Sequence, residues 1–235
     1  TLKAINAIRS ANVILYDALV NPELLDYASS SAEVIFVGKR RGCYSYQQEQ
    51  INDLIVAKAQ RYGHVVRLKG GDSFVFGRGS EELEFAHENN LETDVVPGIS
   101  SALAVPAGQG IPLTMRHVSE SFWVITGTTK MHQLSEDIKI AAQSTATVVI
   151  LMGMGKLNEI VHVFSQAGKA NAPVAIIQNG STTREKSGYG TIDTIEAIVA
   201  EQQLSAPAII VIGDVVENRV TLKSISQNLK QYALS

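Results

Sequence analysis

The sequence predicts an α/β fold made of two domains, and three observations favour it. Short runs of β-branched and aliphatic residues alternate with segments of helical periodicity, a pattern typical of parallel strands joined by right-handed helical crossovers. With 235 residues, 45% of them hydrophobic and 18% charged, the chain can bury one large core or two smaller ones. The turn-rich stretch Gly110–Thr114 separates two alternating series. We therefore expect domains at residues 1–114 and 115–235 with a ligand-binding cleft between them.

In the first series, strands are predicted where β-branched and aliphatic residues form short runs, and helices where apolar residues recur on one face. The expected strands are 13–16, 34–37, a strand ending at 65–66, and 93–96. The expected helices are 1–11, 22–28, 47–62, 80–89 and a small-residue helix ending at 107. Pro22 suits the first turn of its helix, because the N–H that proline lacks would have no partner there.

The second series follows the same criteria. The expected strands are 122–126, 147–152, 174–178 and 208–212, and the expected helices are 133–140, 156–167 and 194–203. Gly188–Thr191 resembles a turn between short strands, so part of the second sheet is expected to be antiparallel.

The stretch Val65–Glu82 carries the strongest indication of a ligand site. Its β-branched run ends in Gly70-Gly71, where residues without Cβ allow a tight turn, and Ser80 followed by acidic residues is typical of a helix start. Polar groups at such a turn bind ligands in open α/β sheets. A plain strand-to-helix connection explains the same pattern equally well. The spacing matches neither a Walker loop nor a GxGxxG fingerprint.

The charge balance argues against a general nucleic-acid-binding protein, since the net charge is -3. Basic residues nevertheless cluster at Lys39–Arg41 and recur at Arg67, Lys69 and Arg78, which suggests a local anion site. A single cysteine, Cys43, suits a reducing compartment. No apolar run is long enough for a membrane span and no signal peptide is visible, so we expect a cytoplasmic protein without a membrane partner.

A series of short motifs follows in order along nearly the whole chain. They are Tyr16-Asp17, Val37–Gly42, Val66–Asp72, Phe76–Gly79, Val96–Ala102, Gly110–Thr114, Leu151–Gly153 and Gln178–Gly180. Each motif alone is weakly specific, but the ordered series closely resembles the tetrapyrrole methylase superfamily, and within it the enzymes that methylate uroporphyrinogen III.

The resemblance implies two α/β domains of the tetrapyrrole methylase type, a homodimer, and S-adenosyl-L-methionine bound in the interdomain cleft. The expected reaction methylates carbons 2 and 7 of uroporphyrinogen III and gives precorrin-2 for siroheme or cobalamin synthesis, with S-adenosyl-L-homocysteine as the second product. No metal is needed for this chemistry, and the five histidines show no ligand spacing.

The chain departs from the superfamily pattern at three places. Members begin with a strand and a GAGPGD-type loop, and this chain starts just after that point. We therefore expect the first sheet to lack that strand, with unpaired backbone groups, and the cofactor to lose one wall. Ser73 stands where proline is common, which should loosen the turn mildly. Met115 stands where histidine is common, which removes a polar contact to substrate.

Eight residues are expected to contact the cofactor by resemblance. They are Gly70, Gly71, Asp72, Val75, Ser100, Ser101, Met152 and Gly180. Glycines let backbone groups approach the methionine moiety, and Met152 offers a soft apolar surface. The alternatives are core packing for Met152 and helix capping for Ser100 and Ser101.

By the same resemblance, Asp17 is a proton acceptor and Lys39 a proton donor. Both follow predicted strands, where open α/β sheets place functional groups. Attack by a pyrrole α-carbon creates a cationic intermediate, and loss of a proton restores neutrality. A helix-capping aspartate and a solvated lysine are the alternatives.

Because uroporphyrinogen III is a polycarboxylate, arginines are candidates for recognising it through paired hydrogen bonds. The candidates are Arg40, Arg41, Arg67, Arg78 and Arg116. We expect at least two of them to be surface residues or ion-pair partners within the protein instead.

Two further classes of function stay open. One is a sister enzyme of the superfamily: another precorrin methylase, a diphthine synthase or a ribosomal-RNA ribose methylase. The Lys39–Gly42 and Phe76–Gly79 motifs favour the uroporphyrinogen enzyme over these. The other is a catalytically impaired tetrapyrrole-binding protein.

Overall fold

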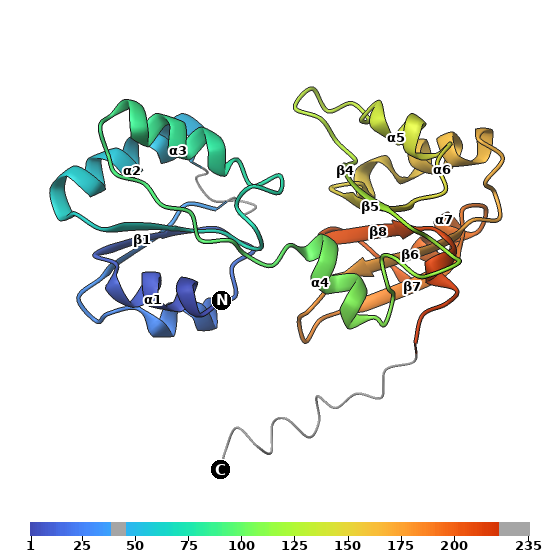
Figure 1. Ribbon diagram of the computed structural model, residues 1–235, viewed down its shortest axis with the longest axis horizontal. Helices are drawn as coiled ribbons and strands as arrows, with labels where there is room; N and C mark the ends of the chain where they lie inside the picture. Colours follow the sequence, from blue (N-terminus) through green and yellow to red (C-terminus); the bar gives the residue numbers. More distant parts are fainter. Residues whose placement is uncertain (39–45, 221–235) are drawn as a thin grey trace, which may run out of the picture. The chain divides into compact units, whose positions relative to one another are not determined.

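The computed structural model describes residues 1–38 and 46–220. The chain divides into two compact units, Thr1–Ser100 and a second that begins at Ser101. Each unit contains its own sheet with helices on both faces (Figure 1). The predicted α/β class is therefore confirmed. The expected domain boundary after residue 114 stays a prediction.

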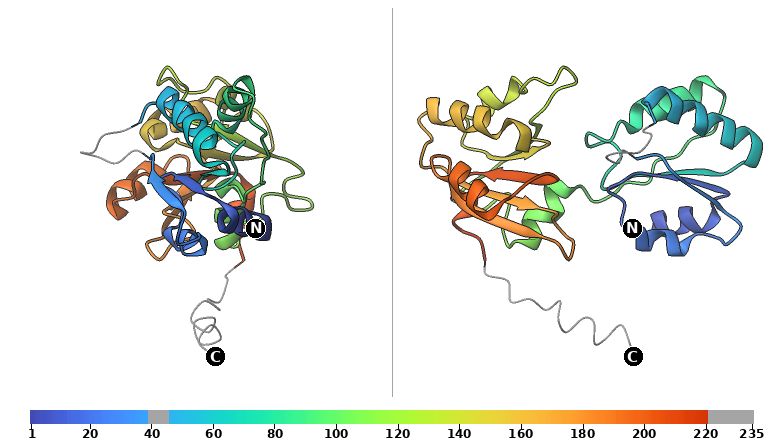
Figure 2. Two further views of the ribbon diagram at one scale, coloured as in Figure 1. Left: turned by 90° about the vertical axis from the view of Figure 1, so that its left-hand side faces the viewer. Right: turned by 180° about the vertical axis from the view of Figure 1, so that it is seen from behind.

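The first unit is built on a three-stranded parallel sheet with the order β2-β1-β3. Its elements are α1 (Leu2–Ser10), β1 (Val13–Tyr16), the 3-10 helix η1 (Pro22–Tyr27), β2 (Glu33–Phe36), α2 (Gln48–Tyr62), β3 (Val65–Leu68) and α3 (Gly79–Glu88). Helices α2 and α3 cover one face, and α1 with η1 covers the other (Figures 1 and 2).

The central strand β1 is buried on both faces, because its alternate side chains enter two different apolar clusters. Ile14 packs with Ile8 of α1 and residues of η1. Val13 and Leu15 pack with Ile51 of α2. The continuous apolar run that predicted this strand therefore reflects burial from two sides.

Two predictions for this unit differ from the structure. Residues 93–96, expected as a strand, are irregular. An extended segment becomes a strand only through hydrogen bonding to a neighbour, and 93–96 pairs with none of the described strands. The expected helix at 22–28 is a 3-10 helix, in which the Asn21 side chain accepts from the Glu23 N–H.

The second unit contains a five-stranded sheet with the order β4-β5-β8-β6-β7. Strands β4 and β5 are parallel, and the other neighbouring pairs are antiparallel. The strands are β4 (Phe122–Thr126), β5 (Thr147–Leu151), β6 (Pro173–Gln178), β7 (Lys186–Thr191) and β8 (Ala208–Ile212). The helical elements are α4 (Ser101–Gly108), α5 (Asp137–Ala141), η2 (Met154–Lys156), α6 (Leu157–Gln166), α7 (Ile195–Gln202) and η3 (Asp214–Val216).

Apolar clusters lie on both faces of this sheet. On one face, Ile138 of α5, Ile160 of α6 and Ile195 of α7 pack together with sheet residues. On the other face, Ala102 and Val105 of α4 pack with residues of β5, β6 and β8. Figure 1 shows α4 on the side of the sheet opposite to α5 and α6.

Strand β7 corrects the prediction of a turn at Gly188–Thr191, although the antiparallel pairing expected there is confirmed. Gly188 and Gly190 lower the strand propensity of this segment. Their lack of side chains gives room to α7, because a Cβ on Gly190 would lie 2.5 Å from the Ile198 Cδ1 atom.

None of the helices in the described part of the chain is long and apolar enough to cross a membrane.

Candidate functional site

The loops that follow β1 and β3 are packed against each other at the carboxyl edge of the first sheet. Register pairs Tyr16 with Leu68, so both strands end at the same level. A Cβ on Gly70 would lie 2.6 Å from the carbonyl oxygen of Leu19, in the loop after β1. The strand–glycine–helix turn predicted from the sequence thus sits where parallel sheets present functional groups.

Asp72 joins this turn to the loop 97–100, directly before α4. One carboxylate oxygen, Oδ1, accepts from the Phe74 N–H at 2.8 Å, and Oδ2 accepts from the Gly98 N–H at 3.0 Å. The two loops also touch through backbone atoms, since a Cβ on Gly98 would lie 2.1 Å from the Gly71 carbonyl oxygen. The structure therefore brings together two segments that the sequence predicts as cofactor contacts.

An apolar surface follows the turn. Phe74, Val75 and Phe76 are 54%, 37% and 44% exposed. The loop is closed behind them by the Gly79 N–H, which donates to the Ser73 carbonyl at 3.0 Å. Val75, expected at the cofactor, belongs to this exposed apolar surface.

Asp17 belongs to a network of two carboxylates and two cations. Arg67 Nη2 donates to Asp17 Oδ1 at 2.7 Å, and Arg67 Nε donates to Glu82 Oε1 at 3.1 Å. Lys69 Nζ lies 3.0 Å from Glu82 Oε2 and 3.9 Å from Asp17 Oδ2. The side chains of Arg67, Lys69 and Glu82 are 12%, 9% and 6% exposed, whereas Asp17 is 29% exposed. The network is thus largely buried, and Asp17 is its most exposed member.

The side chain that caps the following helix η1 is that of Asn21. The alternative in which Asp17 is a helix-capping residue therefore does not apply. Sequence reasoning missed the role of Glu82, which resembles an ordinary acidic residue in a first helical turn. A usable signal was present, however. Arg67 and Lys69 are two residues apart at the end of a strand and so share one face, where two cations need an acidic partner.

The other predicted arginines have different surroundings. Arg78 donates to Glu81 at 2.9 Å and 2.6 Å, and this interaction raises the pKa of the Arg78 guanidinium above its ordinary value. Arg116 is exposed in the segment before β4. The predicted residues Lys39, Arg40 and Arg41 lie outside the described residues.

In the second unit, the expected cofactor residues also emerge at one sheet edge. Ile209 of β8 pairs with Leu151 on one side and Ile177 on the other. Met152 and Gly180, which follow these strands, therefore leave the sheet at the same edge. Met152 is 53% exposed, and its carbonyl accepts from the Thr128 hydroxyl at 2.9 Å. The core-packing alternative for Met152 is therefore wrong.

Gly180 lies against helix α4. A Cβ on Gly180 would lie 2.4 Å from the Val105 Cγ1 atom. Ser101 is the first residue of the same helix, and Ser100, directly before it, is buried. Packing on Val105 explains why no larger side chain fits at Gly180, and its expected contact with the cofactor stays a prediction.

Gly180→Ala is expected to destabilise the protein by about 1–3 kcal/mol, because the added methyl overlaps Val105. Val105→Ala removes the overlapping atoms, so the cost of the double variant should be clearly smaller than the sum of the two single costs. Chemical unfolding of the four proteins measures this. Strict additivity would contradict the close contact.

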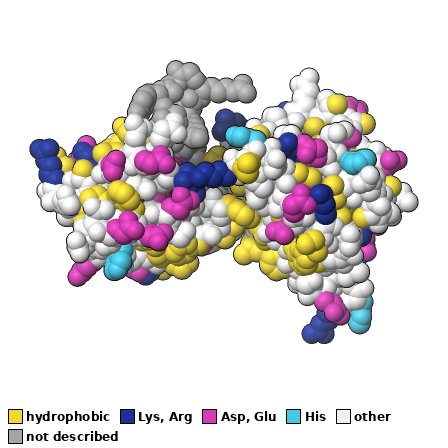
Figure 3. Space-filling view, turned by 90° about the horizontal axis from the view of Figure 1, so that it is seen from above, with side chains coloured by type: hydrophobic (Ala, Val, Ile, Leu, Met, Phe, Trp, Pro, Cys, Tyr) yellow, Lys and Arg dark blue, Asp and Glu magenta, His cyan; other side chains and the backbone are white. Residues whose placement is uncertain are grey.

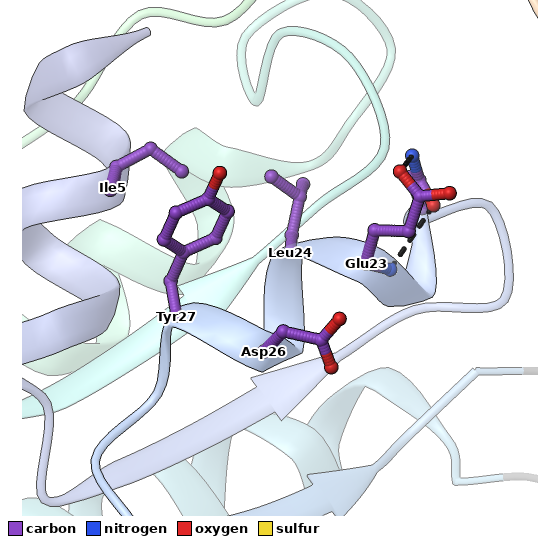
Figure 4. Close-up of a pocket in the computed structure, with 6 residues that line it drawn as sticks. Ile5, Glu23, Leu24, Asp26 and Tyr27 are labelled. Carbon is purple, nitrogen blue, oxygen red and sulfur yellow. Dashed lines mark hydrogen bonds between the residues drawn. The ribbon is translucent and has the colours of Figure 1, made fainter. Parts of the chain in front are cut away.

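Metal-ligating groups, pockets and surface charge give no second candidate site among the described residues. The described residues contain no group of three or more His, Cys, Asp or Glu side chains suited to a metal ion. A pocket of about 420 Å³ between α1 and η1 is lined by Ile5, Asn21, Glu23, Leu24, Asp26 and Tyr27 (Figure 4). It contains none of the predicted site residues. The face drawn in Figure 3 carries acidic and basic side chains intermixed.

Known proteins resemble the chain in both sequence and structure. Residues 1–196 match the family of tetrapyrrole (corrin/porphyrin) methylases. The chain is 43% identical to a uroporphyrinogen-III C-methyltransferase of Methanocaldococcus jannaschii, over 92% of this chain and 90% of that protein. It is 42% identical to a siroheme synthase of Actinobacillus succinogenes, over 92% of this chain but 45% of that protein.

A solved structure of uroporphyrin-III C-methyl transferase from Thermus thermophilus, complexed with S-adenyl homocysteine, aligns with a TM-score of 0.77. The identity is 32%, and the alignment covers 93% of this chain and 92% of that one. These findings confirm the resemblance predicted from the ordered motifs. The chain therefore belongs to the tetrapyrrole (corrin/porphyrin) methylase family.

Proposed function

We propose that the chain is an S-adenosyl-L-methionine-dependent C-methyltransferase that converts uroporphyrinogen III to precorrin-2 by methylating carbons 2 and 7. The observation that carries this proposal is the 43% identity to a uroporphyrinogen-III C-methyltransferase along 90% of that enzyme. The similar solved structure complexed with S-adenyl homocysteine supports the choice of cofactor.

The carboxyl edge of a parallel sheet is where such folds bind ligands, which supports placing the S-adenosyl ligand at this edge of the first sheet. Gly71 is exposed and has no side chain to obstruct a ligand, and Asp72, which accepts from the Phe74 and Gly98 N–H groups, joins the two loops. Phe74–Phe76 in the first unit and Met152 in the second each carry exposed apolar surface, the kind of surface that excludes water from a sulfonium. We assign Gly70, Gly71, Asp72, Val75, Ser100, Ser101, Met152 and Gly180 to the cofactor.

The bound sulfonium supplies an activated methyl with a neutral leaving group, so the protein has to align the acceptor carbon and manage one proton. Asp17 is the proposed proton acceptor. Its Oδ1 is fixed by Arg67 at 2.7 Å, and it is the most exposed member of its network. Lys39 is the proposed proton donor.

The macrocycle carries carboxylates, and arginine forks suit them. We assign Arg40, Arg41, Arg78 and Arg116 to substrate recognition. Arg67 is a weaker candidate than the sequence indicated, because its guanidinium also donates to the Leu15 and Leu68 carbonyls at 3.3 and 3.1 Å. Its donors are thus largely used inside the protein. A homodimer, a cytoplasmic location and a role in siroheme or cobalamin synthesis complete the proposal.

Incubation with uroporphyrinogen III and deuteromethyl-labelled donor tests this function. Mass spectrometry of the tetrapyrrole should show two labelled methyl groups, and calorimetry should show binding of S-adenosylhomocysteine. Label found in RNA or in protein would indicate a sister enzyme of the family. Binding of the tetrapyrrole without binding of S-adenosylhomocysteine would indicate a non-catalytic protein and would overturn the proposal.

A further inference from the structure

The loop that joins β6 to β7 contains Gly180 between two residues with unusual backbone conformations. Asn179 and Ser181 have φ of 50° and 62°, in the left-handed region that costs free energy for residues other than glycine. Contacts around the loop have to offset this cost. One of them comes from Glu185, whose Oε2 accepts from the Ser181 N–H at 2.6 Å. A carboxylate makes such a bond stronger than a neutral acceptor would.

The other carboxylate oxygen of Glu185 reaches the end of helix α4. Glu185 Oε1 accepts from the side-chain amide of Gln109, which follows the last residue of α4. The side-chain oxygen of Gln109, Oε1, in turn accepts from the Tyr189 hydroxyl on β7. The Arg219 guanidinium carbon lies 4.2 Å from the centroid of the Tyr189 ring and stacks on it as a cation–π pair. Glu185 therefore connects the loop to the end of helix α4 and, through Gln109, to strand β7 of the sheet.

The position of the loop relative to α4 is tightly constrained, because Gly180 packs closely against Val105 in the middle of that helix. Two contacts thus set the loop on α4: the packing of Gly180 on Val105, and the bonds of Glu185 to Ser181 and Gln109. Ser101, at the start of α4, belongs to the same proposed cofactor set as Gly180. A small displacement of the loop would change the spacing between these two cofactor residues.

We propose that Glu185 is a positioning residue for the S-adenosyl ligand: it fixes the Gly180 turn on α4 without touching the ligand itself. This inference rests on the proposed function. It assigns a role to a carboxylate that the reaction chemistry does not require, and it places that role in contacts made entirely within the second unit.

Glu185→Ala is expected to raise the Kd for S-adenosylhomocysteine about tenfold, since a charge-assisted bond that holds the binding conformation is lost. Calorimetry well below the unfolding temperature measures this affinity. Hydrogen exchange of the amides of 179–185 should become faster in the same variant. Glu185→Gln should recover most of the affinity, because the Gln109 amide can rotate to match an amide partner. Glu201→Ala, an exposed glutamate of α7, is the matched control and should bind normally.

The outcomes separate the inference from the function on which it rests. Unchanged affinity in Glu185→Ala would overturn the inference alone, and so would faster loop exchange without a change in Kd, because the role would then be structural only. An equal loss in Glu201→Ala would also overturn it. A wild-type chain that binds no S-adenosylhomocysteine would overturn both the inference and the proposed function.

Discussion

Glu82→Gln is expected to destabilise the protein by about 3–5 kcal/mol, the usual cost of removing one partner from a buried ion pair. The Glu82 carboxylate is 6% exposed and accepts from both Arg67 and Lys69, whose side chains are only 12% and 9% exposed. It also accepts from the Gln48 side chain of α2 at 3.1 Å. A neutral amide would leave two buried cations with insufficient compensating charge. Chemical unfolding followed by far-UV circular dichroism measures the loss.

Glu84→Gln is the matched control, because Glu84 lies on the same helix and is exposed. Its effect should stay within about 0.5 kcal/mol. Should Glu82→Gln fail to fold, the double variant Glu82→Gln/Lys69→Met offers a second test. Because this double variant removes the Lys69 cation as well as the Glu82 carboxylate, it should recover part of the stability that Glu82→Gln loses. Equal midpoints for Glu82→Gln and Glu84→Gln would show that the network contributes little.

Gly98→Ala is the second change with a large expected effect, on both stability and ligand binding. The new methyl would meet the Gly71 carbonyl oxygen at 2.1 Å and the Gly71 carbonyl carbon at 2.8 Å. These are backbone atoms, so no side chain can rotate away. The loops must separate, and the bond between the Gly98 N–H and Asp72 is strained or lost. We expect a destabilisation of about 1–3 kcal/mol from overpacking, together with a loss of affinity for S-adenosylhomocysteine of about tenfold or more.

Gly108→Ala is the control for this variant. A Cβ at Gly108, the last residue of α4, meets nothing within 4 Å, and alanine is a better helix former than glycine. The control should therefore be neutral or stabilising, with normal ligand affinity. Normal ligand affinity in Gly98→Ala would argue that the contact between the two loops is not part of the cofactor site.

The sequence predicted those elements whose signal is local. The apolar runs at Val13–Tyr16 and Ala208–Ile212 form buried strands, because burial on both faces requires continuous hydrophobicity. Prediction from the sequence failed where a segment's structure depends on a neighbour that is distant in the chain. Residues 93–96 have strand-like composition but no pairing partner among the described strands, and β7 forms although its glycines disfavour it.

The candidate site shows the same division. The glycine turn at Gly70–Asp72 was recognisable because its motif is short and contiguous. Met152 entered the candidate set only through the family resemblance, and its exposure in the structure was not predicted. The contact of Gly98 with Gly71 and the network around Glu82 join residues far apart in the sequence. Neither composition nor periodicity records which loops meet at a sheet edge. The positions of Arg67 and Asp17 within one ion-pair network needed the folded topology for the same reason.

The separate apolar clusters of the two units determine what an optical probe can report. Trp123 is the one tryptophan in the sequence, and it packs against the cluster of α5, α6 and α7 in the second unit. Intrinsic tryptophan fluorescence therefore follows the melting of the second unit and is blind to loosening around β1, where tyrosines such as Tyr16 can serve as intrinsic reporters.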